Sequence, residues 1–220
     1  MSKPQMLDLF CGAGGATTGY QRAGFEVTGV DLKHGKRYPG EAYIRGDVME
    51  RLNVESLRLF DFIHASPPCQ SFSITKNLRN AQGNSVKETG GDLMDPVRDA
   101  LIASGVPFII ENVVQAPLID PTILCGSSFG LAVRRHRGFE AGNGISLAPA
   151  PACDHKGQGR PVGIYGGMRD NIPSGGRTAH TMDEAREAMG IDWMLWGELC
   201  ESIPPAYTEW IGTQVIDQIS

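Results

Sequence analysis

A cysteine preceded by two prolines is the strongest chemical signal in this sequence. It is Cys69, in the stretch SPPCQSFS at 66–73, which follows an apolar run at 60–65 that is typical of a buried strand. A thiol at the end of a parallel strand emerges at the carboxyl edge of the sheet, and the stiff proline pair would aim it. A lone cysteine is usually buried and inert, but a core cysteine needs no double proline before it. The pattern therefore favours a reactive thiol.

A glycine-rich turn follows the first apolar run. The sequence DLFCGAGG at 8–15 indicates a strand that enters a tight turn, where glycines let the backbone approach a ligand at the sheet edge. The spacing of Gly12, Gly14 and Gly15 departs from the GxGxxG pattern, so it predicts no pyrophosphate site. Many strand-to-helix turns look similar, and the motif alone is a weak signal.

Two carboxylates follow the next two expected strands. Asp31 comes directly after the run 25–30, where it could hold a ribose diol through two hydrogen bonds. Asp47 comes after the run 42–45 and could accept from an adenine amino group. For either residue alone, a solvated aspartate at a strand end is an equally good interpretation.

Three motifs in register resemble the cytosine-5 DNA methyltransferase family. They are DLFCGAGG at 8–15, PPCQSFS at 67–73 and IENV at 110–113. The resemblance extends from Asp8 to Gly212, although 141–178 has no counterpart that we can align. It implies transfer of a methyl group from S-adenosyl-L-methionine to carbon 5 of cytosine in double-stranded DNA. Because a stacked base cannot be reached, the target cytosine would be flipped out of the duplex.

The resemblance also implies a role for each matching catalytic side chain. Cys69 would add to carbon 6 of cytosine as a thiolate, which requires local activation because a free thiol has a pKa of about 8.5. Glu111 would contact ring nitrogen 3 and the exocyclic amino group as a general acid. Arg135 and Arg137, on one side of an extended segment, would support the nucleophile loop and contact O2 of the base. For that segment, a solvated basic edge strand is the alternative.

The remaining site residues are also assigned by resemblance. The predicted cofactor contacts are Asp8, Phe10, Gly12, Gly14, Asp31, Asp47, Pro67 and Ser202. The predicted substrate contacts are Gln70, Ser71, Asn112 and Val113. The chain departs from the family at Glu201, near the expected methionine end of the cofactor. A glutamate there would repel the cofactor carboxylate unless it paired with the cofactor's amino group.

Short apolar runs that alternate with helical patterns must position these residues. This alternation predicts βαβ units and a doubly wound, mostly parallel α/β sheet of the Rossmann-like type. We expect strands at 6–10, 25–30, 42–45, 60–65 and 107–111. We expect helices from the glycine turn to about 24, over 95–104, from a capping box at Thr181 and Glu184 to about 189, and from 204 to about 219.

One catalytic domain with a small insert is the expected organisation. The catalytic domain would comprise 1–140 plus 179–220, a size that permits one full core. The insert, 141–178, is crowded with glycine and proline and predicts loops and short hairpins in a reduced target-recognition region. The polar, glycine-rich stretch 71–92 is too long for a simple connection and is a candidate active-site lid.

Composition limits the class of protein. Hydrophobic residues make up 41% and charged residues 20% of the 220 residues, as in an ordinary soluble domain. The net charge of -5 means that any DNA-binding surface is a local basic one. The five widely spaced cysteines predict free thiols in a reducing compartment. No leader or membrane-spanning run is evident, so we expect a cytoplasmic protein that binds no membrane.

We expect no metal site from the sequence. Cys153, His155 and Cys125 offer three candidate ligands with irregular spacing, a poor match to a tetrahedral zinc site. The basic turn at 33–37 is expected to be a solvated loop, with phosphate contact as the minor alternative.

Two functional alternatives remain open: the same chemistry on RNA, or a non-catalytic DNA- or cofactor-binding relic. The complete set of Cys69, Glu111, Arg135 and Arg137 argues against a relic. The interval 138–182 offers few side chains for reading bases, the evident candidates being Arg160, Arg169, Asn171 and Arg177. We therefore expect a short recognition context, unless a partner protein supplies sequence recognition.

Overall fold

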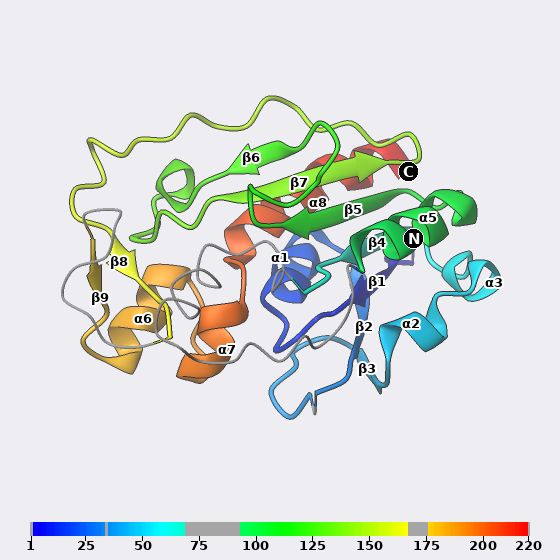
Figure 1. Cartoon of the computed structure of the whole chain (residues 1–220), viewed down its shortest axis with the longest axis horizontal. Coiled ribbons are helices and arrows are strands. Elements are labelled where there is room, and N and C mark those ends of the chain that lie inside the picture. Colours follow the sequence, from blue (N-terminus) through cyan, green and yellow to red (C-terminus); the bar gives the residue numbers. More distant parts are fainter. Residues whose placement is uncertain (1, 34, 69–92, 167–175, 220) are drawn as a thin grey trace, which may run out of the picture.

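A twisted sheet forms the centre of the protein (Figure 1). The computed structural model describes residues 2–33, 35–68, 93–166 and 176–219, and within these the strand order is β3-β2-β1-β4-β5-β7-β6. The pairs from β3 to β5 are all parallel, whereas β7 is antiparallel to both β5 and β6. The bounds are β1 (Gln5–Leu9), β2 (Glu26–Asp31), β3 (Ala42–Arg45), β4 (Phe62–Ala65), β5 (Phe108–Asn112), β6 (Thr122–Leu124) and β7 (Arg137–Gly142). The predicted doubly wound, mostly parallel sheet is confirmed.

Helices begin and end where the local sequence signals place them. Thr181 caps α6 by accepting a hydrogen bond from the Glu184 backbone at 3.1 Å, as the capping-box pattern predicts. Gly105, with φ of 73°, ends α5 in the left-handed conformation that glycine adopts easily. The helices are α1 (Gly15–Ala23), α2 (Val48–Arg51), α3 (Val54–Leu57), α5 (Met94–Ser104), α6 (Met182–Met189), α7 (Trp196–Glu201) and α8 (Pro205–Ile219), with a 3₁₀-helix η1 (Gly126–Phe129). None of the described helices is long and apolar enough to span a membrane.

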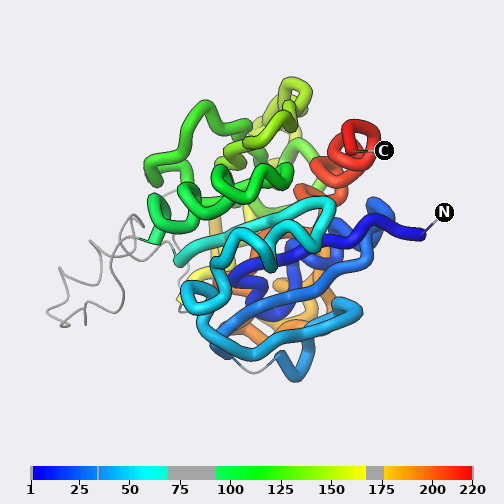
Figure 2. The backbone as a smooth tube through the Cα atoms, turned by 90° about the vertical axis from the view of Figure 1, so that its right-hand side faces the viewer, coloured from blue at the N-terminus to red at the C-terminus, as the bar shows by residue number. Residues whose placement is uncertain are grey.

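The two faces of the sheet carry separate hydrophobic clusters. Alternate side chains of β1 divide between them: Met6 packs on one face, and Leu7 and Leu9 on the other. Helices α1 and α8 cover the first face, where Tyr20 and Tyr207 are fully buried. Helices α2, α3 and α5 cover the second. Figure 2 shows α5 (green) and α8 (red) on opposite sides of the sheet.

A third cluster lies beyond the glycine turn. It joins the strand pair β8 (Val162–Gly163) and β9 (Arg177–Thr178) to α6 and α7, which are grouped together on the left of Figure 1. The two strands pair in parallel, so the hairpin expected in this region is wrong for this pair: a hairpin requires antiparallel strands. The domain boundary at 178 stays a prediction, because the cluster contains residues from both sides of it.

Candidate active site

The turn after β1 is open on one side and tightly packed on the other. Phe10 has φ of 61° and Gly12 of 53°. The left-handed conformation is costly for a phenylalanine, and such strain is typical of ligand-binding positions. A Cβ added to Gly12 would meet nothing within 4 Å, whereas one added to Gly15 would lie 2.2 Å from the Ser202 Oγ. The turn therefore has room for a ligand beside Gly12, and the Ser202 segment closes its other side.

Carboxylates also lie at the carboxyl ends of β2 and β3. The Asp31 Oδ2 accepts a hydrogen bond from the Gly12 backbone at 2.9 Å, and its Oδ1 accepts from the Lys33 backbone at 2.8 Å. This ties Asp31 to the glycine turn and leaves further lone pairs on each oxygen. Asp47 caps α2, because its Oδ1 accepts from the Met49 backbone at 2.9 Å. Both residues lie at the same sheet edge, and their roles in cofactor binding stay predictions.

Asp8 is fully buried beneath the glycine turn. Its Oδ2 accepts a hydrogen bond from the Thr17 hydroxyl at 2.5 Å, while its Oδ1 has no partner among the described residues. The pKa of this carboxyl is raised to about 7, mainly by burial and also by nearby Asp31, against the opposing effect of the Thr17 hydrogen bond. This environment favours a role in fixing α1 under the turn over direct contact with a cofactor.

Ion pairs join the basic turn after β2 to α7. Lys33 pairs with Glu201, and Arg37 pairs with both carboxylate oxygens of Glu198, at 2.9 and 2.7 Å. The turn is exposed, as expected of a solvated loop, and the ion pairs to α7 are an addition to that expectation.

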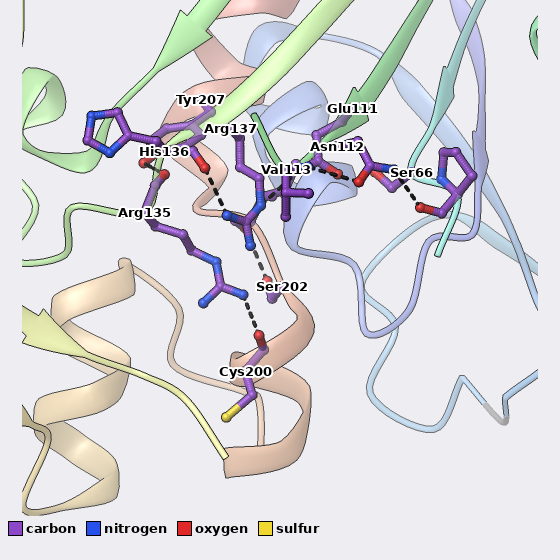
Figure 3. A network of polar contacts seen from close by, with 12 residues as sticks. Ser66, Glu111, Asn112, Val113, Arg135, His136, Arg137, Cys200, Ser202 and Tyr207 are labelled. Atoms are coloured by element: carbon purple, nitrogen blue, oxygen red, sulfur yellow. Dashed lines mark hydrogen bonds and ion pairs between the residues drawn. The ribbon is translucent and has the colours of Figure 1, made fainter. Parts of the chain in front are cut away.

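A buried acid–arginine pair lies at the end of β5. Glu111 is 6% exposed, and its Oε1 is 3.1 Å from the Arg137 Nε (Figure 3). Burial raises the pKa of the Glu111 carboxyl, although Arg137, a hydrogen bond with Ser66 and the charge of Arg135 oppose the shift. A buried carboxyl with a raised pKa keeps its proton to a higher pH than an exposed one, which suits a general acid.

Arg135 is held in a second buried position. It is 4% exposed, and it donates to the carbonyl oxygens of Cys200 and Ile164, while the Tyr207 hydroxyl donates to the Arg135 carbonyl at 2.7 Å. Burial lowers the pKa of the guanidinium to about 10, with a contribution from Arg137. Its Nε has no partner among the described residues. Figure 3 shows the side chains of Arg135 and Arg137 extending toward the segment that carries Cys200 and Ser202.

The prediction of one extended segment holds only in part. β7 begins at Arg137, so Arg135 lies before the strand and not within it. The alternative of a solvated basic edge is wrong for both arginines, because Arg135 is buried, Arg137 pairs with Glu111, and β6 covers the outer edge of β7.

Asn112 connects the end of β5 to the proline turn. The Asn112 Nδ2 donates to the carbonyl of buried Pro67 at 3.0 Å, and its Oδ1 accepts from the Val113 backbone at 2.9 Å. Both the amide nitrogen and the amide oxygen of Asn112 thus bind to the protein itself. These bonds suit a role in positioning the proline turn. Its contact with substrate stays a prediction. Cys69, Gln70, Ser71 and the candidate lid at 71–92 lie outside the described residues.

Sequence reasoning missed a buried polar chain behind Glu111. The His64 Nδ1 lies 3.0 Å from the Tyr20 hydroxyl, and its Nε2 lies 2.8 Å from the Ser66 Oγ. Burial lowers the pKa of His64 to about 3, so the ring is neutral. Ser66 in turn contacts Glu111. A histidine inside an otherwise apolar strand was the available signal, since buried polar groups need partners.

These elements form two neighbouring sites on one sheet edge. One is the glycine turn with Asp31 and Asp47, and the other is the buried group of Glu111, Arg135 and Arg137. The strand order explains the arrangement, because parallel strands on both sides of β1 bring their carboxyl ends together.

Comparisons with known proteins identify the family of this chain. Residues 4–116 match the family model of C-5 cytosine-specific DNA methylases, and the chain belongs to this family. The type II methyltransferase M.XorII of Xanthomonas oryzae pv. oryzae is 33% identical over 153 residues, which are 63% of this chain and 31% of that protein. M.FnuDI of Fusobacterium nucleatum is 40% identical over 83 residues, 34% of this chain and 23% of that protein. The chain thus matches less than a third of the length of these relatives.

Solved structures support the fold. A candidate DNA modification methyltransferase encoded within an Escherichia coli prophage superposes with a TM-score of 0.61 at 15% identity, covering 97% of this chain and 99% of that one. A DNMT2 mutant of Spodoptera frugiperda gives a TM-score of 0.58 at 14% identity, covering 98% and 99%. The methyltransferase EhMeth of Entamoeba histolytica gives 0.61 at 13% identity over the whole of both chains. In general, this family methylates DNA cytosine and uses S-adenosyl-L-methionine.

Proposed function

We propose that this protein transfers a methyl group from S-adenosyl-L-methionine to carbon 5 of cytosine in DNA, through a covalent adduct of Cys69 with a flipped-out base. The observation that carries the proposal is the environment of Glu111. This buried carboxyl has a raised pKa, pairs with Arg137, and lies next to the Pro67 turn that leads to Cys69. Such a carboxyl can neutralise the negative charge that builds up on cytosine when a thiolate adds to it.

The chemical sequence follows from the needs of the base. The Cys69 thiolate forms a bond to carbon 6, and the displaced electrons move into the ring, where Glu111 gives a proton to nitrogen 3. Carbon 5 is then nucleophilic, and S-adenosyl-L-methionine, when bound, would supply the methyl group and leave as S-adenosyl-L-homocysteine. Loss of the carbon 5 proton to a base, with return of the nitrogen 3 proton to Glu111, then restores the double bond and expels the Cys69 thiolate. Arg135 and Arg137 would hold O2 of the base and the nucleophile loop throughout.

The proposed cofactor site uses the glycine turn. Phe10, Gly12 and Gly14 would surround the nucleoside, and Asp31 would accept hydrogen bonds from the ribose diol. Asp47 would accept from the adenine amino group with the oxygen that does not cap α2, while Pro67 and Ser202 would line the methionine end. The space beside Gly12 and the fixed position of Asp31 support this assignment.

Trapping with 5-fluorocytosine tests the adduct. Fluorine at carbon 5 blocks the final elimination, so duplex DNA carrying this base should hold the protein in a denaturant-resistant adduct when the cofactor is present. Cys69→Ser should abolish trapping, and Cys200→Ser should not prevent it. Trapping that persists in Cys69→Ser would show that the nucleophile assignment is wrong. Structured RNA carrying the same base is the second arm, and preferential trapping on RNA would replace DNA as the proposed substrate.

We also propose that sequence recognition is limited. Of the candidate base-reading residues, Arg177 pairs with Glu184, and Arg160 donates to the Gly176 carbonyl at 3.4 Å; Arg169 and Asn171 lie outside the described residues. Because each bidentate base contact contributes about 1–3 kcal/mol, few contacts imply a context of about two to three base pairs, unless a partner protein adds to it. Bisulfite sequencing of a methylated plasmid measures this. A strict motif of four or more base pairs with the purified protein would contradict it.

A further inference from the structure

Four potential metal ligands meet away from the proposed catalytic site. They are the thiols of Cys125 and Cys153 and the imidazoles of His136 and His155, whose ligand atoms all lie within 4.8 Å of one another. The Cys125 Sγ is 3.3 Å from the His155 Nε2, and the Cys153 Sγ is 3.6 Å from the His136 Nε2. The three ligands counted from the sequence were therefore an incomplete set, because His136 supplies a fourth.

Three separate segments bring these side chains together. Cys125 precedes η1 directly after β6, and His136 precedes β7. Cys153 and His155 belong to the connection 143–161, which contains no helix or strand. His155 begins the turn 155–158, directly after the irregular segment that carries Cys153. Figure 1 shows this connection (yellow-green) returning from the end of β7 along the outer edge of the sheet, beside β6, to β8.

We propose that these four side chains bind a structural zinc ion. Zinc bonds of about 2.3 Å to sulfur and about 2.0 Å to nitrogen place the two atoms about 3.5 Å apart in a tetrahedron, and the two sulfur–nitrogen distances of 3.3 and 3.6 Å lie on either side of this value. Two thiolates and two imidazoles favour zinc over magnesium or calcium, which prefer oxygen ligands. Binding would release the two thiol protons to solvent.

The surroundings fix the ligands in place. The Ser127 Oγ is 3.2 Å from the Cys125 Sγ and accepts a hydrogen bond from the Asp154 backbone at 3.2 Å. The Asp154 Oδ1 accepts a hydrogen bond from the Gly157 backbone at 2.7 Å. This carboxylate is not among the clustered ligands. Arg134 donates to the carbonyl of His155 at 2.9 Å. Such contacts around a metal orient its ligands and strengthen binding.

The proposed ion would tie the connection 143–161 to the arginine segment at 134–137. His136 stands between Arg135 and Arg137, and Figure 3 shows its ring pointing away from both. A connection of this length without secondary structure is unusual unless something holds it. Zinc would fix it to the start of β7 and thereby help to hold the two arginines in place. The inference rests on the cluster and does not depend on the proposed methyl transfer.

Metal analysis of the reduced, purified chain tests this proposal. After removal of loosely bound ions, mass spectrometry should find about one zinc per chain, as expected for one closed tetrahedral site. His155→Ala and Cys153→Ser should lose the metal. His155→Cys, which keeps four zinc ligands, should retain it, as should Cys200→Ser, which removes a thiol outside the cluster.

Cobalt distinguishes loss of the site from loss of the fold. Apoprotein refilled with Co²⁺ should show the visible absorption of tetrahedral cobalt with thiolate ligands, and the spectrum should change in His155→Cys but persist. Circular dichroism of His155→Ala should remain that of a folded protein. Three results would overturn the proposal: no zinc or cobalt in the wild-type chain, unchanged metal content in His155→Ala and Cys153→Ser, or a Cys125–Cys153 disulfide in protein alkylated directly on lysis.

Discussion

The proposed cofactor edge and the proposed base edge of the sheet are built from different kinds of contact. At the cofactor edge, formed by β1, β2 and β3, Asp31 and Asp47 accept from backbone amides close to them in space and remain partly exposed. At the base edge, formed by β4, β5 and β7, Glu111 and Arg135 are buried and bound to groups from distant segments.

This difference separates binding from chemistry. A partly solvated carboxylate can accept hydrogen bonds from a ligand. A buried acid next to arginines has a shifted pKa and can exchange a proton with the base. We therefore expect substitutions at the cofactor edge to change affinity for the donor, and substitutions at the base edge to change the rate of methyl transfer or the stability of the fold.

The largest effect is expected from Glu111→Gln. Glutamine cannot deliver the proton that neutralises the base, and general-acid catalysis contributes about 10²–10⁴-fold. Single-turnover methyl transfer should slow by at least about tenfold, while calorimetry should find nearly unchanged cofactor affinity. An unchanged single-turnover rate would remove Glu111 from the mechanism and break the contrast between the two edges.

Next in size is the loss of a buried cation. Arg137→Met leaves Glu111 buried without its partner, and breaking a buried ion pair costs about 3–5 kcal/mol of folding free energy. Arg37→Met is the matched control at the cofactor edge, where the pair with Glu198 is more exposed, with side chains 38% and 30% exposed. Denaturant unfolding should find a clearly smaller loss for Arg37→Met. Equal losses would mean that burial does not distinguish the two edges.

Asp31→Ala should weaken cofactor binding without affecting DNA binding. Hydrogen bonds to a charged group contribute about 1.5–3 kcal/mol, so we expect a loss of about tenfold to a hundredfold in cofactor affinity by calorimetry. Asp47→Ala is a useful comparison variant. It should also lower the free energy of unfolding by about 1 kcal/mol, because Asp47 caps α2. Normal cofactor affinity in Asp31→Ala would refute the ribose contact.

The smallest effect is a change in how stability depends on pH. The pKa of Asp8 is raised from 3.8 to about 7, so the folded state holds this proton more tightly than the unfolded state. The resulting stabilisation is fully present below about pH 4 and is lost as the pH rises toward 7. The pKa of His64, lowered from 6.5 to about 3, gives stability that is present above pH 6.5 and is lost as pH falls. The two trends oppose each other between about pH 4 and 6.5.

Conservative variants separate these trends. Asp8→Asn should leave the His64 trend unopposed, so stability would rise with pH by up to about 1.4 kcal/mol per unit more than in the wild type. His64→Gln should have the opposite effect. Urea unfolding at several pH values between 4.5 and 6.5 measures both slopes, and slopes that match the wild type in both variants would contradict the burial of these groups.

The sequence predicted the parallel core well, because its signals are local. The apolar runs, the capping box at Thr181 and Glu184, and Gly105 each act within a few residues, and the structure confirms the elements they predict. The short helices α2, α3 and α7 and the strand β6 were missed, and of β7 only the start, at the arginine segment, was expected. Each is brief or depends on partners distant in the chain, so periodicity provides no clear signal.

The contacts that fix the site could not be predicted in the same way. The bond from Arg135 to the Cys200 carbonyl, the pair of Lys33 with Glu201 and the fourth ligand, His136, depend on tertiary packing. The roles of Glu111 and the two arginines were predicted from the resemblance of their motifs to a family, because their residue types by themselves do not indicate a role. The polar chain through His64 had one local signal, a histidine in an apolar strand, but no local pattern identified its partners.

The most direct test of the account is a nucleoside analysis. The purified chain is incubated with unmodified duplex DNA and S-adenosyl-L-methionine, and the digested DNA is examined by mass spectrometry, with Cys69→Ser as the control. The account predicts 5-methyldeoxycytidine as the methylated nucleoside, formed by the wild-type chain and absent with Cys69→Ser. Methylation of adenine, methylation of cytosine at another atom, or equal product from Cys69→Ser would contradict it.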